Sequence, residues 1–487
     1  MKTLLPPVTP SVRGTIDADL PLCVDLDGTL IMTDILWESV AKLIKTRPAS
    51  VLLIPLWLMK GKAHLKYQIA RRVELDVTSL PYNKDLLLFL KQESTRGRRL
   101  ILATATNILI AQRISDYLNI FSEVIASDER LNLSGPNKLR AIQARFGHQF
   151  AYAGNDPVDL TIWDHAAQAI VVNSKESLIK KVQQRKKIGK IFNRPTNSFA
   201  ALIKEMRVQQ WAKNLLIFVP LITAHKVGDA ALVLQAIGGF VAFSLCASSA
   251  YILNDLMDLE ADRHNLQKRF RPLADGRLSV RLGLAITPLL FAASLATTLL
   301  LPLAFLKIVA LYFALTCAYS LYLKQLVLVD VITLAALYTL RIYAGSVAIG
   351  VTTSKWLLAF SMFVFLSLAL IKRFSELYKT KNLKSQTLSG RDYRIEDLQH
   401  VSTMGVASGY IAVLVLALYI SSQEVTALYS HPDVLWLICP LIFYWISRAW
   451  LLASRGCMHE DPIVFALWDK RSYLIALLIG AVLVLAL

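Results

Sequence analysis

Two patterns of apolar and polar residues divide this chain. Up to about residue 200, short apolar runs at 21–24, 100–103 and 150–153 alternate with helix-like stretches, and each run ends in polar residues. Short continuous apolar runs of this kind are typical of buried parallel strands. From about residue 207 onward the apolar runs become long enough to cross a bilayer. The pattern therefore predicts a Rossmann-like α/β domain followed by an all-α membrane domain.

Nine transmembrane helices are predicted in the second part. The composition agrees, since the whole chain is 55% hydrophobic and 18% charged with a mean hydropathy of +0.47. Such values exclude a protein that is soluble throughout its length. The predicted segments are 212–224, 232–253, 282–301, 303–323, 326–350, 356–371, 403–421, 434–453 and 472–487.

The basic residues set the predicted orientation. The net charge is +18, and lysines and arginines gather after the second, fourth, sixth and eighth segments, while the other loops carry only Lys226 and Lys355 at their edges. The positive-inside rule then places the even loops and the N-terminal domain in the cytoplasm of a multi-pass plasma (inner) membrane protein. Residues 1–14 lack the apolar core of a signal peptide, which agrees.

The same positive charge bears on partners. Basic residues close to a bilayer attract anionic membrane lipids, which we expect this chain to contact. The sequence carries no RNA- or DNA-binding module, so nucleic acid is excluded as a partner. The oligomeric state is left open, a homo-oligomer included.

An acidic stretch directly follows the second apolar segment. Asp255, Asp258 and Asp262 are three and four residues apart, so they share one face of a helix, and Asn254 precedes them. A basic stretch, residues 268–271, comes next and contains Lys268, Arg269 and Arg271. Carboxylates with cations close behind, at the end of a membrane helix, predict a site for Mg²⁺ and phosphate. An ordinary charged interfacial loop is the alternative.

More polar residues are expected around a cytoplasm-facing pocket. Arg341 is notable because it lies about ten residues inside the fifth apolar segment, where a charge must face a polar cavity. The others lie near segment ends on the same predicted side of the membrane. They are Lys213, Asn214, Tyr319, Lys324, Lys372, Arg373 and Glu376.

Four motifs in the N-terminal domain lie at strand ends or helix starts. Two carboxylates, Asp25 and Asp27, precede Gly28-Thr29, Thr104 follows the run at 100–103, and Lys138 follows Gly135-Pro136-Asn137. A last acidic cluster contains Asp156 and Asp159. In this order the motifs resemble those of haloacid dehalogenase-like phosphatases, over about residues 18–185.

That resemblance implies a role for each motif. Asp25 would be the nucleophile that forms an aspartyl-phosphate, and Asp27 the general acid/base. Thr104 and Lys138 would hold the phosphoryl oxygens, while Asp25, Asp27, Asp156 and Asp159 are candidates for binding Mg²⁺. Many family members have Gly-Asp where this chain has Gly154-Asn155. This departure leaves open which carboxylate reaches the metal, and also whether the domain only binds its ligand.

The expected boundaries follow from these motifs. Residues 1–185 form the phosphatase-like domain, with a helical cap at about 31–98, 186–206 form a basic linker on the membrane surface, and 207–487 form the membrane domain. The apolar run 51–59 within the cap is too short to span a bilayer. It is interpreted either as a buried cap helix, which is slightly favoured, or as an interfacial segment.

The membrane part also carries family motifs. The acidic stretch with residues 268–276, and Tyr319 to Lys324, resemble the signatures of the UbiA-type prenyltransferase superfamily. Two further stretches, 207–214 and 372–377, resemble the branch of that superfamily that contains decaprenyl-phosphate phosphoribosyltransferase. The resemblance covers about residues 200–487 and implies a nine-helix bundle.

If this branch is the right one, the substrates are phosphoribosyl pyrophosphate and a polyprenyl phosphate. Mg²⁺ held by the aspartates would neutralise the leaving pyrophosphate. The fused phosphatase would then dephosphorylate the lipid product. One alternative is an aromatic prenyltransferase that uses an allylic polyprenyl diphosphate. Another is a lipid transporter or binding protein with a regulatory phosphatase-like domain.

Overall fold

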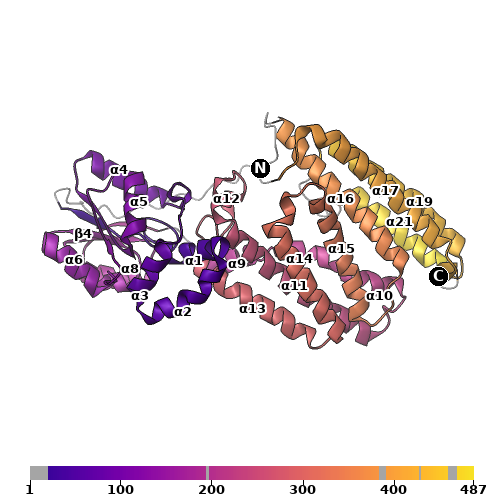
Figure 1. The fold of residues 1–487 in the computed structure, drawn as a ribbon, viewed down its shortest axis with the longest axis horizontal. Helices are drawn as coiled ribbons and strands as arrows, with labels where there is room; N and C mark the ends of the chain where they lie inside the picture. Colours follow the sequence, from indigo (N-terminus) through magenta and orange to yellow (C-terminus); the bar gives the residue numbers. More distant parts are fainter. Residues whose placement is uncertain (1–19, 194–196, 383–390, 427–428, 459–464, 466–468) are drawn as a thin grey trace. The chain divides into compact units, whose positions relative to one another are not determined.

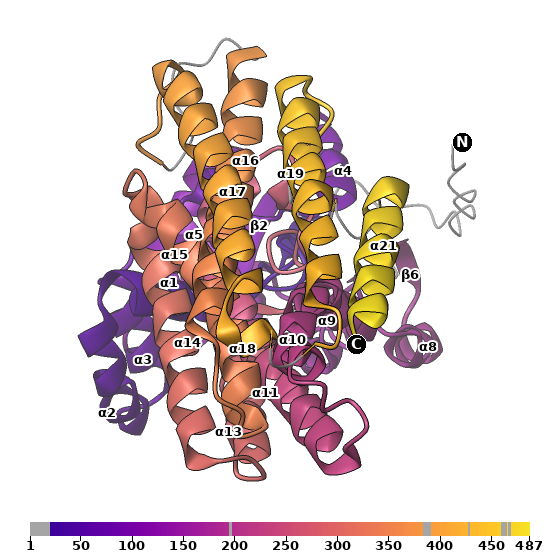
Figure 2. The same cartoon turned by 90° about the vertical axis from the view of Figure 1, so that its right-hand side faces the viewer.

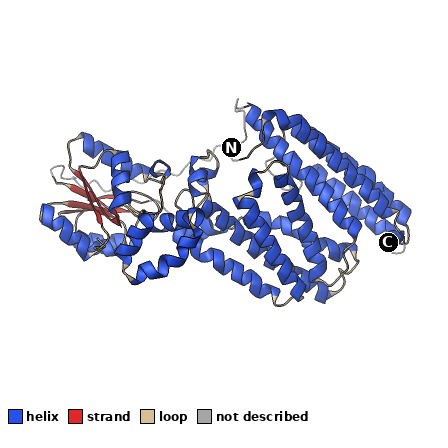
Figure 3. Cartoon of the chain, viewed as in Figure 1, coloured by secondary structure: helices blue, strands red, loops and turns tan. Residues whose placement is uncertain are grey.

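The computed structural model of the chain describes residues 20–193, 197–382, 391–426, 429–458, 465 and 469–487. The chain forms two compact units. The first contains Met1–Met206 and Tyr251–Thr287, and the second contains Arg207–Ala250 and Pro288–Leu487. Among the described residues, strands occur only in the first unit, and the second is built of helices (Figure 3). This division confirms the predicted α/β domain and helical membrane domain.

A six-stranded parallel sheet forms the centre of the first unit (Figure 1). Its strand order is β3-β2-β1-β4-β5-β6, and each neighbouring pair is parallel. The three strands expected from the apolar runs are neighbours, because β1 lies in the middle with β2 and β4 beside it. Their carboxyl ends therefore lie together along one edge of the sheet. The strands are β1 Leu22–Val24, β2 Leu100–Asn107, β3 Glu123–Ser127, β4 Ala151–Gly154, β5 Gln168–Val172 and β6 Ile188–Phe192.

Helices cover both faces of the sheet, so alternate residues of each strand are buried in opposite cores. Leu22 and Val24 pack with α4 (Lys84–Thr95) and α5 (Ile108–Leu118). Cys23, between them, packs on the other face with α6, α7 and α8. The bounds of these three helices are α6 Pro136–Phe146, α7 Leu160–Trp163 and α8 Glu176–Arg185.

The segment between β1 and β2 is helical, as a cap was expected to be. Its first part has a small core of its own, which includes Leu43, Trp57 and Ile69. The last helix, α4, instead packs on the sheet. The elements before α4 are α1 Ile35–Thr46, η1 Pro48–Leu53, α2 Ile54–Met59, α3 Lys62–Ala70 and η2 Val77–Ser79.

The sheet extends past residue 185, the expected end of the domain. Ile188–Phe192 pairs with β5 as the edge strand β6, because its residues continue the parallel ladder. The stretch 186–206 therefore contains a strand and the helix α9 (Ser198–Glu205), where a linker was expected.

The first unit also includes the acidic stretch and its neighbours. A long helix, α11 (Ala230–Met257), ends there and is followed by α12 (Leu259–His264) and η5 (Lys268–Phe270). The next long helix, α13 (Val280–Thr298), begins in this unit. Residues 251–287 thus belong with the sheet domain, although the sequence pattern assigns them to the membrane part.

Seven helices in the described residues are long and apolar enough to cross a membrane, which confirms a multi-pass membrane protein but not nine spans. The expected first span is instead the 3-10 helix η4 (Val208–Phe218) and the short α10 (Val219–Thr223), with Pro220 near its start. The expected last span, α21 (Lys470–Ala486), is an apolar helix of 17 residues. Besides α11 and α13, the seven are α14 Leu303–Leu321, α15 Val329–Ala348, α16 Lys355–Asn382, α17 Leu398–Ile420 with η7 Ile395–Asp397, and α19 Ile438–Ser454 with η8 Pro432–Leu437.

Within the second unit, α15, α16, α17 and α19 lie side by side and share one apolar core (Figure 2). Small residues allow close helix contacts, as is typical of membrane bundles. A methyl group at Gly405 of α17 would come within 2.0 Å of the Trp450 ring of α19. At Gly345 of α15 it would meet the carbonyl oxygen of Ile217 at 2.1 Å. Both glycines are therefore required by packing.

Candidate functional site

Two candidate sites occur in the first unit, and the first lies at the edge of the sheet. Asp25 follows β1, and its Oδ1 accepts a hydrogen bond of 2.8 Å from Lys138 Nζ at the start of α6. Thr104 in β2 is fully buried, and its hydroxyl accepts the N–H of Thr106. The structure thus brings Asp25 and Lys138 together, as the motif order predicts.

Asp27 is held in a fixed orientation by two hydrogen bonds. The backbone N–H of Ile35 donates to Oδ1 at 2.7 Å, and the Thr106 hydroxyl donates to Oδ2 at 2.7 Å. Burial, with Asp34 nearby, raises the pKa of Asp27 to about 6, although both hydrogen bonds oppose this shift. Burial likewise raises the pKa of Asp25 to about 7, against the attraction of Lys138. Both carboxyls therefore titrate near neutral pH.

The last acidic cluster divides into different roles. Asp159 accepts hydrogen bonds from the Tyr152 hydroxyl and from the backbone N–H groups of Asn155 and Asp156. Asp156 caps the turn 157–159 by accepting the N–H of Val158. Tyr152 also accepts a hydrogen bond from Lys138 Nζ at 3.0 Å. Tyr152 thus links Asp159 to Lys138, a connection that the sequence motifs do not reveal.

Asn155 lies against the loop that carries the first two aspartates. Its side-chain oxygen accepts a hydrogen bond of 3.1 Å from the Thr29 hydroxyl. Gly28 has a φ of 73°, and a methyl group there would lie 2.2 Å from the Asn155 amide nitrogen. Only glycine fits this position, because it tolerates both the positive φ and the close approach. Asn155 is therefore a site residue that the sequence analysis noted only as a departure from the family pattern.

A lysine of the cap reaches the same region. Lys66 Nζ of α3 donates to the carbonyl of Ala105 at 2.6 Å and to Asn132 Oδ1 at 3.0 Å. Burial lowers the pKa of Lys66, while Asp27 and Asp34 oppose the shift. No motif marks this residue in the sequence, since its position depends on how the cap folds over β2.

The second candidate site is the acidic stretch at the end of α11. Asp255 and Asp262 both accept hydrogen bonds from Nη1 of Arg271, at 2.8 Å and 2.5 Å. Asp258 lies between the two helices α11 and α12, and its carboxylate is 3.6 Å from Lys45 Nζ. Burial raises the pKa of Asp262, although Arg271 opposes this effect. The predicted spacing thus brings Asp255 and Asp262 to one point.

The other predicted residues of this stretch surround that point. Lys268 Nζ lies 3.9 Å from Asp262, and the Asn254 amide donates to Asp255 at 3.2 Å. Arg269 is exposed and lies over the ring of Phe270. Cations lie beside acids here, as expected for binding a magnesium–phosphate group.

Side chains of the cap bind the acidic stretch directly. Glu38 of α1 forms a two-fold ion pair with Arg263, at 2.6 Å and 3.2 Å, and both side chains are buried. Lys42 pairs with Glu260, and Lys45 Nζ donates to the carbonyl of Met257 at 2.6 Å. We call these contacts between α1 and residues 257–263 the cap clamp. The cap clamp holds α12 against the cap of the sheet domain.

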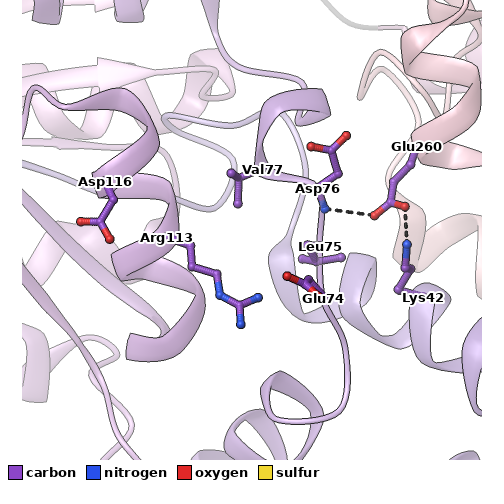
Figure 4. Close-up of a pocket in the computed structure, with 8 residues that line it drawn as sticks. All are labelled: Lys42, Glu74, Leu75, Asp76, Val77, Arg113, Asp116 and Glu260. Atoms are coloured by element: carbon purple, nitrogen blue, oxygen red, sulfur yellow. Dashed lines mark hydrogen bonds and ion pairs between the residues drawn. The ribbon is translucent and has the colours of Figure 1, made fainter.

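A groove of about 520 Å³ opens beside the cap clamp (Figure 4). Glu260 lies on one side of it, bonded to Lys42 and to the backbone N–H of Asp76 (Figure 4). Arg113 and Asp116 of α5 lie on the other (Figure 4). None of the site residues predicted from the sequence lines this groove.

In the second unit, Arg341 is buried in α15 with neutral partners. Its guanidinium donates to Asn214 Oδ1 at 2.8 Å, to the Tyr312 hydroxyl at 2.7 Å and to the carbonyl of Leu337 at 2.6 Å. Asn214 in turn donates to the hydroxyl of Ser244. A buried cation without a carboxylate partner in the described chain keeps its positive charge available for an anion.

Arg373 has a different environment. It is fully buried and pairs with Asp330 at 2.5 Å and with Glu376. Asp330 also accepts the hydroxyl of Tyr393 and the guanidinium of Arg391. These contacts neutralise Arg373 and join α15, α16 and the chain before α17. Arg373 and Glu376, predicted as substrate-binding residues, therefore lie in a structural ion-pair network.

The remaining predicted residues are placed as follows. Lys213 Nζ lies over the ring of Tyr338, at 5.7 Å from its centre. Tyr319, Lys324 and Lys372 are partly exposed, at the end of α14, in the 3-10 turn that follows it and in α16.

The donor groups fit Mg²⁺ in kind, although the described residues contain no group of three or more His, Cys, Asp or Glu side chains arranged to hold a metal ion. At the acidic stretch, the carboxylates of Asp255 and Asp262 both contact one guanidinium nitrogen, Nη1 of Arg271. The point where the two carboxylates meet is thus occupied by a positive charge. At the sheet edge, Asp25 and the amide oxygen of Asn155 belong to adjoining loops. Oxygen donors of this kind are those that Mg²⁺ prefers.

Comparison with known proteins identifies the membrane part. Residues 215–469, more than half of the chain, match the UbiA prenyltransferase family. The chain belongs to this family. A Sinorhizobium fredii relative, named uncharacterized protein y4nM, is 38% identical over 97% of this chain and 92% of its own length. The similarity to that relative therefore extends over both parts of this UbiA family member.

Other relatives cover one part of the chain each. The Mycobacterium tuberculosis protein named decaprenyl-phosphate phosphoribosyltransferase is 35% identical over 188 residues, or 38% of this chain and 62% of that relative. A UbiA homolog from Archaeoglobus fulgidus bound to DMAPP and Mg²⁺ is 19% identical, with a TM-score of 0.46 over 58% of this chain and 97% of that one. A HAD family hydrolase from Salmonella enterica is 14% identical, with a TM-score of 0.27 over 36% of this chain and 68% of that one.

Proposed function

We propose that this protein transfers a 5-phosphoribosyl group from phosphoribosyl pyrophosphate to a polyprenyl phosphate of the decaprenyl type. The observation that carries the proposal is the buried Arg341, whose partners among the described residues are all neutral, in a chain similar to decaprenyl-phosphate phosphoribosyltransferase. In an aromatic prenyltransferase reaction, only one substrate, the prenyl diphosphate, bears a phosphate-containing group. The proposed reaction has two, so it needs a second set of cations.

Binding of the pyrophosphate is assigned to the acidic stretch. Asp255, Asp258 and Asp262 are the candidates for holding Mg²⁺, which would neutralise the charge of the leaving group. Arg271, which both outer aspartates already contact, would move from the carboxylates to the pyrophosphate oxygens. Lys268 and Arg269 would share that charge. Asn254 would orient Asp255 through its hydrogen bond.

Binding of the lipid phosphate is assigned to the second unit. Arg341 and Asn214 would contact this phosphate, with Lys213, Lys324, Lys372 and Tyr319 as further candidates. The phosphate oxygen attacks the anomeric carbon of the ribose as pyrophosphate leaves, and it needs no base because it is already ionised near neutral pH. Arg373 and Glu376, in contrast, are assigned a structural role, because Asp330 neutralises the arginine.

The phosphatase-like domain is proposed to remove the 5-phosphate from the product. The Asp25 carboxylate would attack phosphorus, and Lys138 and Thr104 would bind the phosphoryl oxygens. Asp27, with a pKa of about 6, would give a proton to the leaving ribose oxygen and then take one from water. Water thus releases inorganic phosphate and polyprenylphosphoryl-ribose, which would feed cell-envelope arabinose biosynthesis. Asp25, Asp27 and Asn155 would hold Mg²⁺, with Asp156 and Asp159 supporting this loop.

The test uses the purified full-length protein in nanodiscs with Mg²⁺, phosphoribosyl pyrophosphate and decaprenyl phosphate. The wild type should release pyrophosphate and inorganic phosphate, and mass spectrometry should find the dephosphorylated lipid. Asp25→Asn should release only pyrophosphate and accumulate the phosphorylated lipid. Asp255→Asn should release neither. Equal phosphate release by wild type and Asp25→Asn would reject the role of the first domain.

The same assay separates the other functions. Consumption of geranyl diphosphate with an aromatic acceptor, and not of phosphoribosyl pyrophosphate, would indicate an aromatic prenyltransferase. A lipid transporter would retain its function in Asp255→Ala and Asp258→Ala variants. The proposal also places the protein in the plasma membrane with its phosphatase-like domain in the cytoplasm, where soluble phosphoribosyl pyrophosphate is available.

A further inference from the structure

One surface of the cap is apolar and exposed. Leu52 at the end of η1 is 81% exposed, and Leu56 and Met59 of α2 are 56% and 83% exposed. Trp57, on the opposite side of α2, is 8% exposed and packs into the core of the cap. The segment is thus fixed to the cap by one face and presents the other. We call residues 48–59 the apolar cap segment.

Along the sequence, the charged residues around this segment have a single sign. No aspartate or glutamate occurs between Glu38 and Glu74, while eight lysines and arginines do. Those that flank the segment directly, Arg47, Lys60 and Lys62, are exposed. Apolar side chains bordered by lysine and arginine are the composition of helices that lie in the headgroup region of an anionic bilayer.

The segment also lies next to the start of a membrane helix. Leu284, in the second turn of α13, packs against the same cap core as Trp57. Arg281 of α13 lies over the ring of Trp37 in α1, at 5.8 Å from its centre. Because α13 is long and apolar enough to span a bilayer, its first turns would lie near the membrane surface.

We propose that the apolar cap segment inserts into the headgroup region of the bilayer and anchors the phosphatase-like domain there. Leu52, Leu56 and Met59 would be buried among the upper acyl chains, and Arg47, Lys60 and Lys62 would contact anionic headgroups. The occupant of this surface is therefore the membrane itself. This orientation also explains why a cap exposes large apolar side chains that a soluble enzyme would cover.

A spin-label experiment on the full-length protein tests this. A nitroxide is attached at Leu56→Cys, after replacement of the accessible native cysteines by serine, in nanodiscs that contain phosphatidylglycerol. At this position, collisions with oxygen should exceed those with a water-soluble nickel chelate. The matched control is Leu88→Cys on α4, an exposed leucine of the same unit. There the nickel chelate should dominate.

Two results would overturn the proposal. If the nickel chelate dominates at Leu56→Cys as it does at Leu88→Cys, the segment lies in water. If neither reagent reaches Leu56→Cys, protein covers it, as in a contact with a second copy. A second variant combines Lys60→Glu with Lys62→Glu. It should lower the collisions with oxygen at the label on Leu56→Cys, and only in nanodiscs that contain phosphatidylglycerol. None of these readouts depends on enzymatic activity, so they are independent of the proposed reaction.

Discussion

Asp25 and Lys138 show how the sheet creates reactivity at single residues. Burial alone would keep Asp25 protonated, and the ammonium group 2.8 Å away partly restores its charge. The resulting pKa of about 7 lets small changes in the local charge switch the carboxyl between its protonated and its ionised form. A divalent cation bound at Asp25 would be such a change, because it would displace the proton.

This gives a prediction about proton release. Because the pKa of Asp25 is about 7, most of the metal-free protein carries a proton on Asp25 near pH 6. Adding Mg²⁺ at that pH should therefore release protons into weakly buffered solution. At about pH 8.5 the carboxyl is already ionised, and the release should be much smaller. A pH-indicator dye measures the difference. Asp25→Asn serves as control, and equal release from this variant would contradict the assignment.

Sequence and structure agree unevenly at this scale. The contact between Asp25 and Lys138 could be predicted from the order of the motifs, which places Asp25 after a strand and Lys138 at a helix start. Tyr152 and Lys66 could not, because the first lies inside an ordinary apolar strand and the second depends on the fold of the cap. Arg373 was predicted as a phosphate ligand. Its pairing with Asp330, 43 positions away, is a tertiary contact that no local pattern reveals.

At the scale of elements, α1 is the helix that joins the sheet domain to the acidic stretch. It buries Glu38 on the face that meets Arg263 and uses Lys42 and Lys45 one and two turns later. The Arg263 guanidinium also donates to the carbonyl of Ala274 at 2.9 Å. Since α12 has only six residues, its position depends on such contacts more than on its own helical stability.

Breaking the buried pair should therefore be costly. Arg263→Ala leaves Glu38 buried and unpaired, and we expect the first unit to lose about 3–5 kcal/mol of stability. Replacing both residues by methionine should recover most of this loss. Urea unfolding of the full-length protein in detergent, followed by tryptophan fluorescence, measures these values.

A matched control for this prediction is Arg185→Ala. It removes an exposed ion pair of similar length, with Asp164, and should cost no more than about 1 kcal/mol. Losses of the same size in Arg185→Ala and Arg263→Ala would show that the buried pair has no special weight. Hydrogen exchange in α12 locates the effect, since the amides of this helix should lose protection in Arg263→Ala and not in Arg185→Ala.

At the scale of the whole molecule, the sequence predicts the two-part organisation and most spans but not their number. Seven apolar runs form long helices, and α13 is one of them although it contains Pro288. The run 212–224 differs because it is short and contains Pro220, and it forms a 3-10 helix and one short α-helix. The mean hydropathy of a sequence window registers neither the shortness of this run nor its proline.

The predicted orientation can be tested with a native residue. Cys457 is exposed and follows α19, so the positive-inside rule places it in the cytoplasm. A membrane-impermeant maleimide should label it in inverted membrane vesicles and not in intact spheroplasts. A Cys457→Ser variant controls for labelling of the other four cysteines. Labelling from the outside only would reverse the topology.

The cap clamp has a further consequence for the covalent chain. Its ion pair joins Glu38 and Arg263, which are 225 positions apart, so the peptide connection through β6 and α9 acts as a tether between them. A tether of this kind maintains an effective concentration of the order of millimolar at the contact. Cutting the chain between α9 and η4 would remove the tether and leave an ordinary association between two molecules. The concentration of each half in the membrane would then determine the fraction of molecules in which the cap clamp holds α12 in place.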